Sequence, residues 1–424
     1  MTTATETRRS GRPRARGLAL VPLVLGGVGI GTTEFVTMGL LPEIADGVGV
    51  SIPTAGHAIS AYAIGVVIGA PGVALLGARL PRRGLLVVLM LLFAVGNAAT
   101  AAAPGYGWLV ADRFLTGLPH GAFFGVASLV AHDLAAPDLG GRAVGRVMLG
   151  IPIANILGVP IATAIGQQAG WRAAYGAIAA IGLLTALGVA RLVPHQEPDR
   201  DAHPRRELGA LADLQVWLTL AVGAVGFGGS FAMYSYISPI LQQQTGLPSD
   251  AVPLYLLVYG VGGLLGTLAA GRLVDRSVLR TLVGSSLACG VLLLAFAYAA
   301  DSPVPAAVVL FALCMAISAF VLSLQLRLMS VAGAARTLGA AGNHAALNIA
   351  NALGAWLGGL VLAAGWGWRA PSLVGAALSL GGLLLLAASV ALERHRRAGP
   401  RSSAAPGGPA HRQSDGLRHH HGRR

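Results

Sequence analysis

One carboxylate lies well inside the first long apolar stretch of the chain: Glu34, within residues 18–42. A charged side chain in lipid is costly, so we expect Glu34 to face the interior of a helix bundle or water. A carboxyl group in a poorly hydrated site can bind and release a proton, which suits proton coupling or substrate contact. The alternative is a structural carboxylate, hydrogen-bonded to Thr33 and Thr37 or paired with Arg113.

Polar residues recur at helical spacing in the fourth apolar stretch. Arg113, Gly117, His120 and Phe124 stand at i, i+4, i+7 and i+11, which places them on one helix face. His120 lies about 10 Å beyond Arg113 by helical rise, and imidazole exchanges protons near neutral pH. Arg113 is a candidate functional charge. His120 is either a proton carrier or a packing histidine.

The eleventh stretch carries His344, Asn348 and Asn351 at i, i+4 and i+7, and Asn155 lies in the fifth. Amides on one face of an apolar helix predict a hydrated substrate cavity, or else hydrogen bonds that join helices. Aromatic residues at helical spacing either line that cavity or pack the core: Phe35, Phe123, Phe124, Phe231, Tyr234 and Tyr236.

Residue types that are missing exclude whole classes of chemistry. All 30 basic residues are arginine, so the chain has no Walker A lysine and no Schiff-base lysine. If the chain moved a solute uphill, it would have to use an ion or solute gradient, or a partner subunit, and we expect no cofactor. Cys289 and Cys314 lie in apolar stretches and are interpreted as buried hydrophobes. The run His419–His421 lies in a Pro/Gly/Ser/Arg-rich tail, for which we expect disorder rather than a metal site. No nucleophile–base set is evident, so we do not expect an enzyme.

The composition is that of a membrane protein. Of 424 residues, 54% are hydrophobic and 11% charged, against roughly 25% charged in soluble domains. Apolar stretches of membrane-spanning length recur twelve times. They predict an all-α membrane protein with spans at 18–42, 54–78, 84–103, 107–131, 142–165, 171–193, 214–239, 251–272, 279–300, 303–327, 338–363 and 369–391.

The arginines predict the orientation. If both termini are cytoplasmic, all but Arg113, Arg172 and Arg369 fall at the inner face or in the tails, as the positive-inside rule requires. We predict two six-helix bundles, at 18–193 and 214–391, joined by a cytoplasmic linker at 194–213. A basic cytoplasmic tail at 1–17 precedes them, and a disordered cytoplasmic tail at 392–424 follows. The tails also suit contact with anionic lipid.

The pattern of landmarks predicts that the two halves of the chain are repeats of one another. Corresponding landmarks recur at intervals of 194 to 197 residues: Pro42 with Pro239, Gly77 with Gly271, Asn155 with Asn351, and Trp171 with Trp368. We expect Pro42 to end the first helix and Pro239 to end the seventh. Two related bundles predict a substrate site near the midplane between them.

Several segments are also familiar as motifs: GTTEFVTMGLLP at 31–42, LPRR at 80–83, RFLTGLPHGAFFG at 113–125, ANILGVP at 154–160 and GWR at 170–172. In these segments the chain resembles the major facilitator superfamily over 18–391. Within it the drug:proton antiporter branch fits best, near arabinose-efflux-permease-like and chloramphenicol-resistance proteins. The resemblance implies two pseudo-symmetric six-helix bundles working by alternating access. It also implies that Arg113 assists proton transfer and that Gly158 and Pro160 kink the fifth helix.

Two arginine-rich turns resemble the family's inner-turn gating motif, one with Gly77, Arg82 and Arg83, the other with Gly271, Asp275 and Arg276. The first copy has Pro81 where the family usually has an aspartate. It therefore lacks the acid that a charge relay at that turn would use.

The sequence as a whole predicts a secondary transporter of the plasma or inner membrane. We expect it to export a small amphipathic, drug-like molecule, for example a phenicol, in exchange for protons, and to act as a monomer without nucleic acid. The alternatives are efflux of a sugar, nucleoside or other metabolite, or a membrane receptor that transports nothing.

Overall fold

The computed structural model describes residues 13–77, 80–135, 139–196, 213–332 and 336–398, and within these ranges the chain is built from helices and short turns. Twelve helical segments are long and apolar enough to cross a membrane, which confirms the predicted all-α membrane fold. The predicted linker falls largely outside these ranges, as do both tails for most of their length.

The first six spans form the amino-terminal bundle. Its elements are α1 (Pro13–Gly39), α2 (Leu41–Gly47), α3 (Ile52–Ala55), α4 (His57–Gly77), α5 (Arg82–Ala101), α6 (Tyr106–Leu134), α7 (Gly140–Met148), α8 (Gly150–Ile153), η1 (Ala154–Gly158), α9 (Val159–Ala169) and α10 (Trp171–Leu192). The segments α7 to α9 run on from one another as the fifth span, which covers Arg142–Ala169.

The last six spans form the carboxy-terminal bundle. Its elements are α11 (Leu214–Ala221), η3 (Val222–Gly226), α12 (Phe227–Tyr234), α13 (Ile237–Gln243), η4 (Ser249–Ala251), α14 (Val252–Arg276), α15 (Val278–Ala299), α16 (Pro303–Val331), α17 (Arg336–Ala363) and α18 (Ala370–Ala398).

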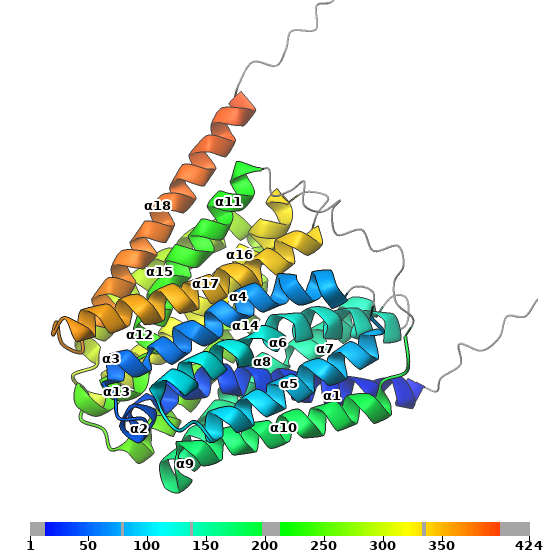
Figure 1. Ribbon diagram of the computed structural model, residues 1–424. Coiled ribbons are helices and arrows are strands. Elements are labelled where there is room, and N and C mark those ends of the chain that lie inside the picture. The colour runs from blue at the N-terminus through cyan, green and yellow to red at the C-terminus, as the bar shows by residue number, and fades with distance from the viewer. Residues whose placement is uncertain (1–12, 78–79, 136–138, 197–212, 333–335, 399–424) are drawn as a thin grey trace, which may run out of the picture.

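The two bundles converge at one end of the molecule and diverge toward the other (Figure 1). The short helices α2, α3 and α13 lie where they converge, and we call this the acidic end because Glu43, Asp46 and Asp301 lie there. The opposite end, where α5 begins and α14 ends, is called the arginine-rich end. The axes of α18 and α10 point to widely separated places at this end (Figure 1).

The first helix of each bundle ends before the proline that we expected to end it. Helix α1 stops at Gly39, and Pro42 lies in the first turn of α2; α12 stops at Tyr234, and Pro239 lies inside α13. The break falls at equivalent residues, with φ and ψ of −111° and 18° at Leu40 and −113° and 21° at Tyr236. Proline has no N–H to bond the carbonyl oxygen one turn earlier, and its ring crowds that carbonyl, so each break falls in the turn before its proline.

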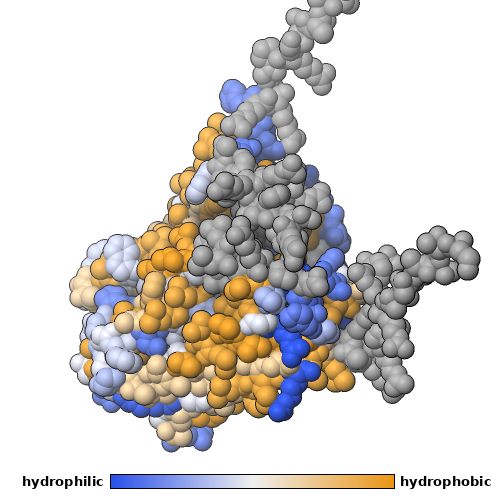
Figure 2. Space-filling view, turned by 45° about the vertical axis from the view of Figure 1, so that its right-hand side comes forward, coloured by the Kyte–Doolittle hydropathy of each residue, from blue (hydrophilic) through white to orange (hydrophobic). Residues whose placement is uncertain are grey.

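Large apolar side chains cover the outside of both bundles. Figure 2 shows a broad hydrophobic surface with hydrophilic patches toward its margins. Leu92, Leu115, Leu184 and Leu294 are among the exposed members of this surface. A soluble protein rarely exposes so much contiguous apolar area, whereas lipid accepts it.

Candidate functional site

Glu34 lies in α1 at the boundary between the two bundles, and its side chain is buried. Its Oε1 accepts a hydrogen bond from Nδ2 of Asn351 on α17, at 3.3 Å. The two residues are far apart in sequence and belong to different bundles. This contact therefore links the acidic group directly to the relative position of the bundles.

Arg113 lies beside Glu34 but binds the preceding residue. Its guanidinium donates to both the hydroxyl and the carbonyl oxygen of Thr33, each at 3.0 Å. Its charge also lies over the ring of Tyr62, 4.2 Å from the centroid, an arrangement that stabilises a desolvated cation. Among the described residues no ion pair joins Arg113 to Glu34, so the direct pairing considered from sequence is not what holds either group.

The hydroxyls next to Glu34 in sequence are also engaged elsewhere. Thr33 donates to Oδ1 of Asn97 on α5, and Thr37 shares a hydrogen bond of 2.6 Å with the hydroxyl of Tyr175 on α10. The structural alternative, in which Glu34 is hydrogen-bonded to Thr33 and Thr37, is therefore not what the structure shows. Instead, the hydroxyls tie α1 into the amino-terminal bundle and leave Glu34 directed toward the other one.

A chain of rings leads from Arg113 across the boundary. The hydroxyl of Tyr62 lies 3.1 Å from Nδ1 of His120, and the ring of His120 packs 5.6 Å from that of Phe124. Phe124 in turn stacks on His344 of α17, with centroids 6.4 Å apart and planes nearly parallel. The structure thus brings the predicted residues Arg113, His120 and His344 into one contiguous array.

The predicted amides lie in two separate places between the bundles: Asn348 and Asn351 on α17, and Asn155 beside α14. On α17, Nδ2 of Asn348 donates to the carbonyl of His344 at 3.0 Å. Asn155 is half-buried on η1, where its carbonyl oxygen approaches Gly260 of α14 so closely that a Cβ there would stand 2.5 Å away. Asn155 therefore lies at the contact between the fifth and eighth spans, apart from Asn351.

Aromatic rings gather beside Glu34. The ring of Phe35 is parallel to that of Phe231 at 6.4 Å and meets the edge of Tyr234 at 6.2 Å, so one amino-terminal ring joins two carboxy-terminal ones. Phe123 lies elsewhere: it is fully buried within the amino-terminal bundle, where its ring fills the space above Gly26.

The fifth span contains a local widening where a kink was predicted. A π-helical turn, η1, occupies Ala154–Gly158 immediately before Pro160. Proline has no N–H for the α-helical ladder, and π turns are one way in which a helix accommodates an irregularity. Gly158 also permits close packing, because a Cβ there would lie 2.1 Å from the hydroxyl of Thr32 on α1.

The two arginine-rich turns differ in their contacts. Arg82 pairs with Asp133 at the end of α6, and Arg83 donates to the carbonyl of Ala190 on α10. Gly77 ends α4. In the second copy Gly271, Asp275 and Arg276 lie in the last turns of α14, and both charged residues are exposed. The first copy thus recruits the acid it lacks from α6.

Sequence comparison places the chain among known proteins. The family model of the Major Facilitator Superfamily matches residues 23–342 and, in a second match, 220–421. The chain belongs to the Major Facilitator Superfamily. It is 41% identical over 367 residues to the inner membrane transport protein YdhP of Escherichia coli K12, covering 87% of this chain and 94% of that protein.

Other members confirm the resemblance that the motifs indicated. The chain is 34% identical over 361 residues to the putative transporter AraJ of Escherichia coli K12, covering 85% of this chain and 92% of that protein. It is 33% identical over 348 residues to a chloramphenicol resistance protein of Streptomyces lividans, covering 80% and 87%.

A solved structure shares the fold. The D-xylose-proton symporter superposes with a TM-score of 0.71 over 87% of this chain and 97% of the symporter, at 17% identity. The family match, the inner membrane relative and the twelve candidate spans together identify this major facilitator protein as a multi-pass inner-membrane transporter and not an enzyme.

Three residues that hydrogen-bond to the site were not singled out from the sequence of this major facilitator protein: Asn97, which bonds Thr33, Tyr175, which bonds Thr37, and Tyr62, which bonds His120. Asn97 carried a usable signal, since it is a lone amide in an apolar helix and polar groups within membranes need partners. The tyrosines gave no such signal, because tyrosine is common in membrane helices as a packing residue.

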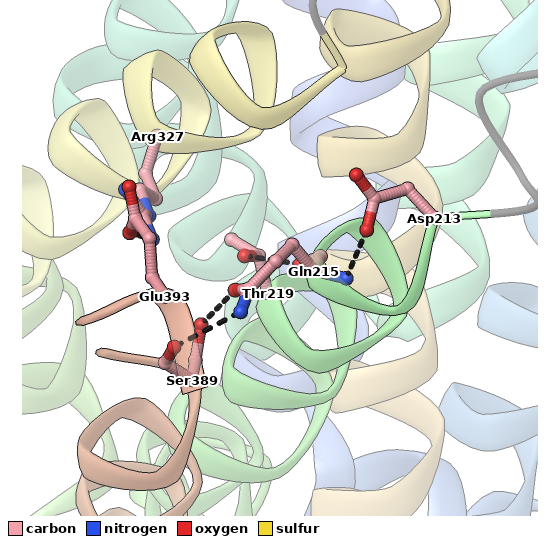
Figure 3. Close-up of polar contacts among 6 residues, drawn as sticks. All are labelled: Asp213, Gln215, Thr219, Arg327, Ser389 and Glu393. Atoms are coloured by element: carbon pink, nitrogen blue, oxygen red, sulfur yellow. Dashed lines mark hydrogen bonds and ion pairs between the residues drawn. The ribbon is translucent and has the colours of Figure 1, made fainter. Parts of the chain in front are cut away.

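A further polar cluster holds the carboxy-terminal bundle together toward the arginine-rich end (Figure 3). The side chains of Gln215 on α11 and Ser389 on α18 are joined by a hydrogen bond of 2.6 Å, and Arg327 of α16 pairs with Glu393 of α18 at 2.5 Å. All four residues belong to one bundle. The cluster therefore keeps three helices of that bundle together as a unit.

Proposed function

We propose that this protein exports a small amphipathic, drug-like molecule in exchange for protons by alternating access. The observation that carries the proposal is Glu34, a buried carboxyl group at the boundary of the bundles that accepts a hydrogen bond from Asn351 of the opposite bundle. A group in this position can respond to a proton and to bundle movement together. No soluble domain is needed for such coupling.

In the proposed cycle, protonation changes what Glu34 offers to its surroundings. The deprotonated carboxylate accepts hydrogen bonds from Asn351 and from a substrate donor, and the positive charge of Arg113 nearby stabilises it. The protonated group is neutral and a weaker acceptor, so it releases the substrate donor and loosens the link to α17. Proton and substrate therefore compete for one site, which is the requirement for exchange. We assign proton transfer along the array to Arg113 and His120.

The predicted orientation indicates which end of the molecule is open, and the direction of transport is proposed from the resemblance to efflux proteins. The concentration of arginines places the arginine-rich end in the cytoplasm, and the bundles diverge there (Figure 1). We therefore interpret the conformation as open to the cytoplasm and closed on the other side, ready to receive a substrate for export. The name of the chloramphenicol resistance relative supports a drug-like substrate.

The proton gradient supplies enough energy. Each proton that moves inward releases about 2.3 kcal/mol per 100 mV and about 1.4 kcal/mol per pH unit. Each of these contributions supports at least roughly tenfold accumulation of substrate. The site lies within one chain, so we expect a monomer to be sufficient.

The test is proton flux in inverted membrane vesicles. A pH gradient is built, and phenicols, sugars and nucleosides are added separately while the gradient is followed with a fluorescent dye. Collapse by one class, lost in Glu34→Gln, supports antiport and identifies the class. Collapse by sugars or nucleosides alone favours metabolite efflux over drug efflux.

Two outcomes contradict the proposal. If radiolabelled compounds cross the membrane without proton movement, Glu34 is structural and the protein is a facilitator. If purified protein in liposomes moves none of the compounds under any gradient, the receptor alternative is favoured.

A further inference from the structure

Two amide side chains of α17 divide their hydrogen-bonding groups in the same way. Nδ2 of Asn348 donates to the carbonyl of His344, and Nδ2 of Asn351 donates to Glu34. Oδ1 of each amide is buried, and within the described parts of the chain neither oxygen has a hydrogen-bond partner. Both donors are therefore used and both acceptors are free.

A free buried amide oxygen calls for an explanation, because leaving an acceptor unpaired costs about 1–3 kcal/mol. Most buried polar side-chain atoms in proteins have a partner, either protein or ordered water. Asn348 and Asn351 are three residues apart, so they are neighbours on one face of α17. Two adjacent unpaired acceptors on that face indicate a ligand or water that donates to both.

The surroundings of these oxygens define the ligand further. Glu34 adds a carboxylate beside Asn351, so the polar edge of the site is made of acceptors. Phe231 lies near the same face of α17, since a Cβ added at Gly354, three residues after Asn351, would stand 2.7 Å from the Cβ of Phe231. The ring of Phe35 is parallel to that of Phe231 and meets the edge of Tyr234, so these rings supply an apolar aromatic wall. A complementary molecule has a ring to pack on this wall and hydroxyl or N–H groups to meet the acceptors.

We propose that Asn348 and Asn351 determine substrate specificity by accepting hydrogen bonds from hydroxyl or N–H groups of a molecule that also carries an apolar ring. The inference rests on the proposed function, since it concerns the same boundary, but it does not require proton coupling. A molecule of the same shape whose donor is replaced by a non-donor leaves an acceptor unpaired and binds more weakly.

The test measures equilibrium binding to purified protein in detergent. Thiamphenicol and florfenicol are suitable probes because they differ only in a hydroxyl that is replaced by fluorine in florfenicol. We expect the protein to bind thiamphenicol about threefold to tenfold more tightly, as one hydrogen bond to a neutral acceptor predicts. We expect Asn348→Leu combined with Asn351→Leu to remove the preference.

Folding and function are checked separately. The melting temperature of each variant shows whether it is folded, and Ser323→Ala is the matched control, because that buried hydroxyl bonds within its own helix α16 and should leave the preference unchanged. Equal binding of the two probes by the unmodified protein, binding of neither, or a preference that survives the double leucine variant overturns the inference. A preference that is present without any proton flux supports the inference while contradicting antiport.

Discussion

The hydroxyl of Tyr236 in the carboxy-terminal bundle packs directly on Gly56 of the amino-terminal bundle. A Cβ added at Gly56 would lie only 2.2 Å from the oxygen of that hydroxyl. The same hydroxyl donates to the carbonyl of Ala355 at 2.8 Å. Tyr236 is also the residue at which the helix path breaks between α12 and α13. A glycine of one bundle thus receives a fixed side chain of the other at the acidic end.

We expect Gly56→Ala to weaken closure at the acidic end. Its backbone is right-handed helical, so alanine is tolerated locally, but the added methyl must displace the ring of Tyr236. Cysteine accessibility measures this: Ser60→Cys, placed where Ser60 bonds the carbonyl of Ala352 across the boundary, should react several-fold faster with an impermeant maleimide in the Gly56→Ala background.

The assay has a low background and a matched control. Cys289 and Cys314 are both buried. Gly84→Ala, also in a helix but with open space at its Cβ, should leave the labelling rate unchanged. Equal labelling in the Gly56→Ala and Gly84→Ala backgrounds would show that the contact does not control closure.

We expect Arg113→Lys to lower proton-coupled transport at least tenfold. An ammonium cannot donate to both oxygens of Thr33 while stacking over Tyr62 as the planar guanidinium does. Thr33→Val, which removes one of the two acceptors, should have a smaller effect of about twofold to tenfold. Rates of proton-coupled transport in vesicles check both predictions, and Arg172→Lys, near the acidic end, is the control. Full transport activity of Arg113→Lys would contradict the role assigned to the guanidinium.

We expect Gly158→Ala to destabilise the protein by about 1–3 kcal/mol, the usual cost of overpacking, because the new methyl meets the hydroxyl of Thr32. Adding Thr32→Ala should restore much of the loss. A thermal double-mutant cycle in detergent measures the coupling. Gly125→Ala, with open space around it, serves as the control; a double variant no more stable than Gly158→Ala would mean that the glycine acts in some other way.

The stability at low pH should depend on Asp301. Hydrogen bonds from Gln244 and then from Arg369 hold the pKa of this exposed carboxyl below its ordinary value. A lowered folded-state pKa gives stability that is present above the unfolded pKa, near 4, and lost as the pH falls through the folded value. We expect a small decrease in the melting temperature between pH 5 and pH 3 that is reduced in Asp301→Asn. Asp250→Asn is the control, and an unchanged pH profile in Asp301→Asn would contradict the prediction.

Much of the fold was predictable because lipid imposes simple rules on sequence. An apolar stretch of about 20 residues with few charges predicts a membrane-spanning helix. The twelve spans therefore followed directly from hydropathy. The breaks at Leu40 and Tyr236 and the two π turns were not predicted, because they depend on local hydrogen bonding that leaves hydropathy unchanged.

For the candidate site, the sequence identified chemical types but not partners. Glu34 and Asn351 both stood out as polar residues in apolar helices, yet their contact depends on how two distant bundles pack. The same reason explains why Arg113, one of the partners considered for Glu34, instead binds Thr33. Pairwise geometry between bundles is tertiary information that helical spacing does not contain.

The π turn in the fifth span has a consequence for evolution by insertion and deletion. A π turn holds one more residue than an α turn, and each residue advances a helix by about 100°. Deleting one residue within Ala154–Gly158 would therefore restore a regular α turn and keep Thr163 of α9 facing Gly39 on α1, whereas a deletion from a regular helix would turn Thr163 away. The carboxy-terminal bundle has its own π turn in its first span rather than its fifth. Each bundle thus holds its surplus residue in a different span, and the two bundles are not interchangeable parts.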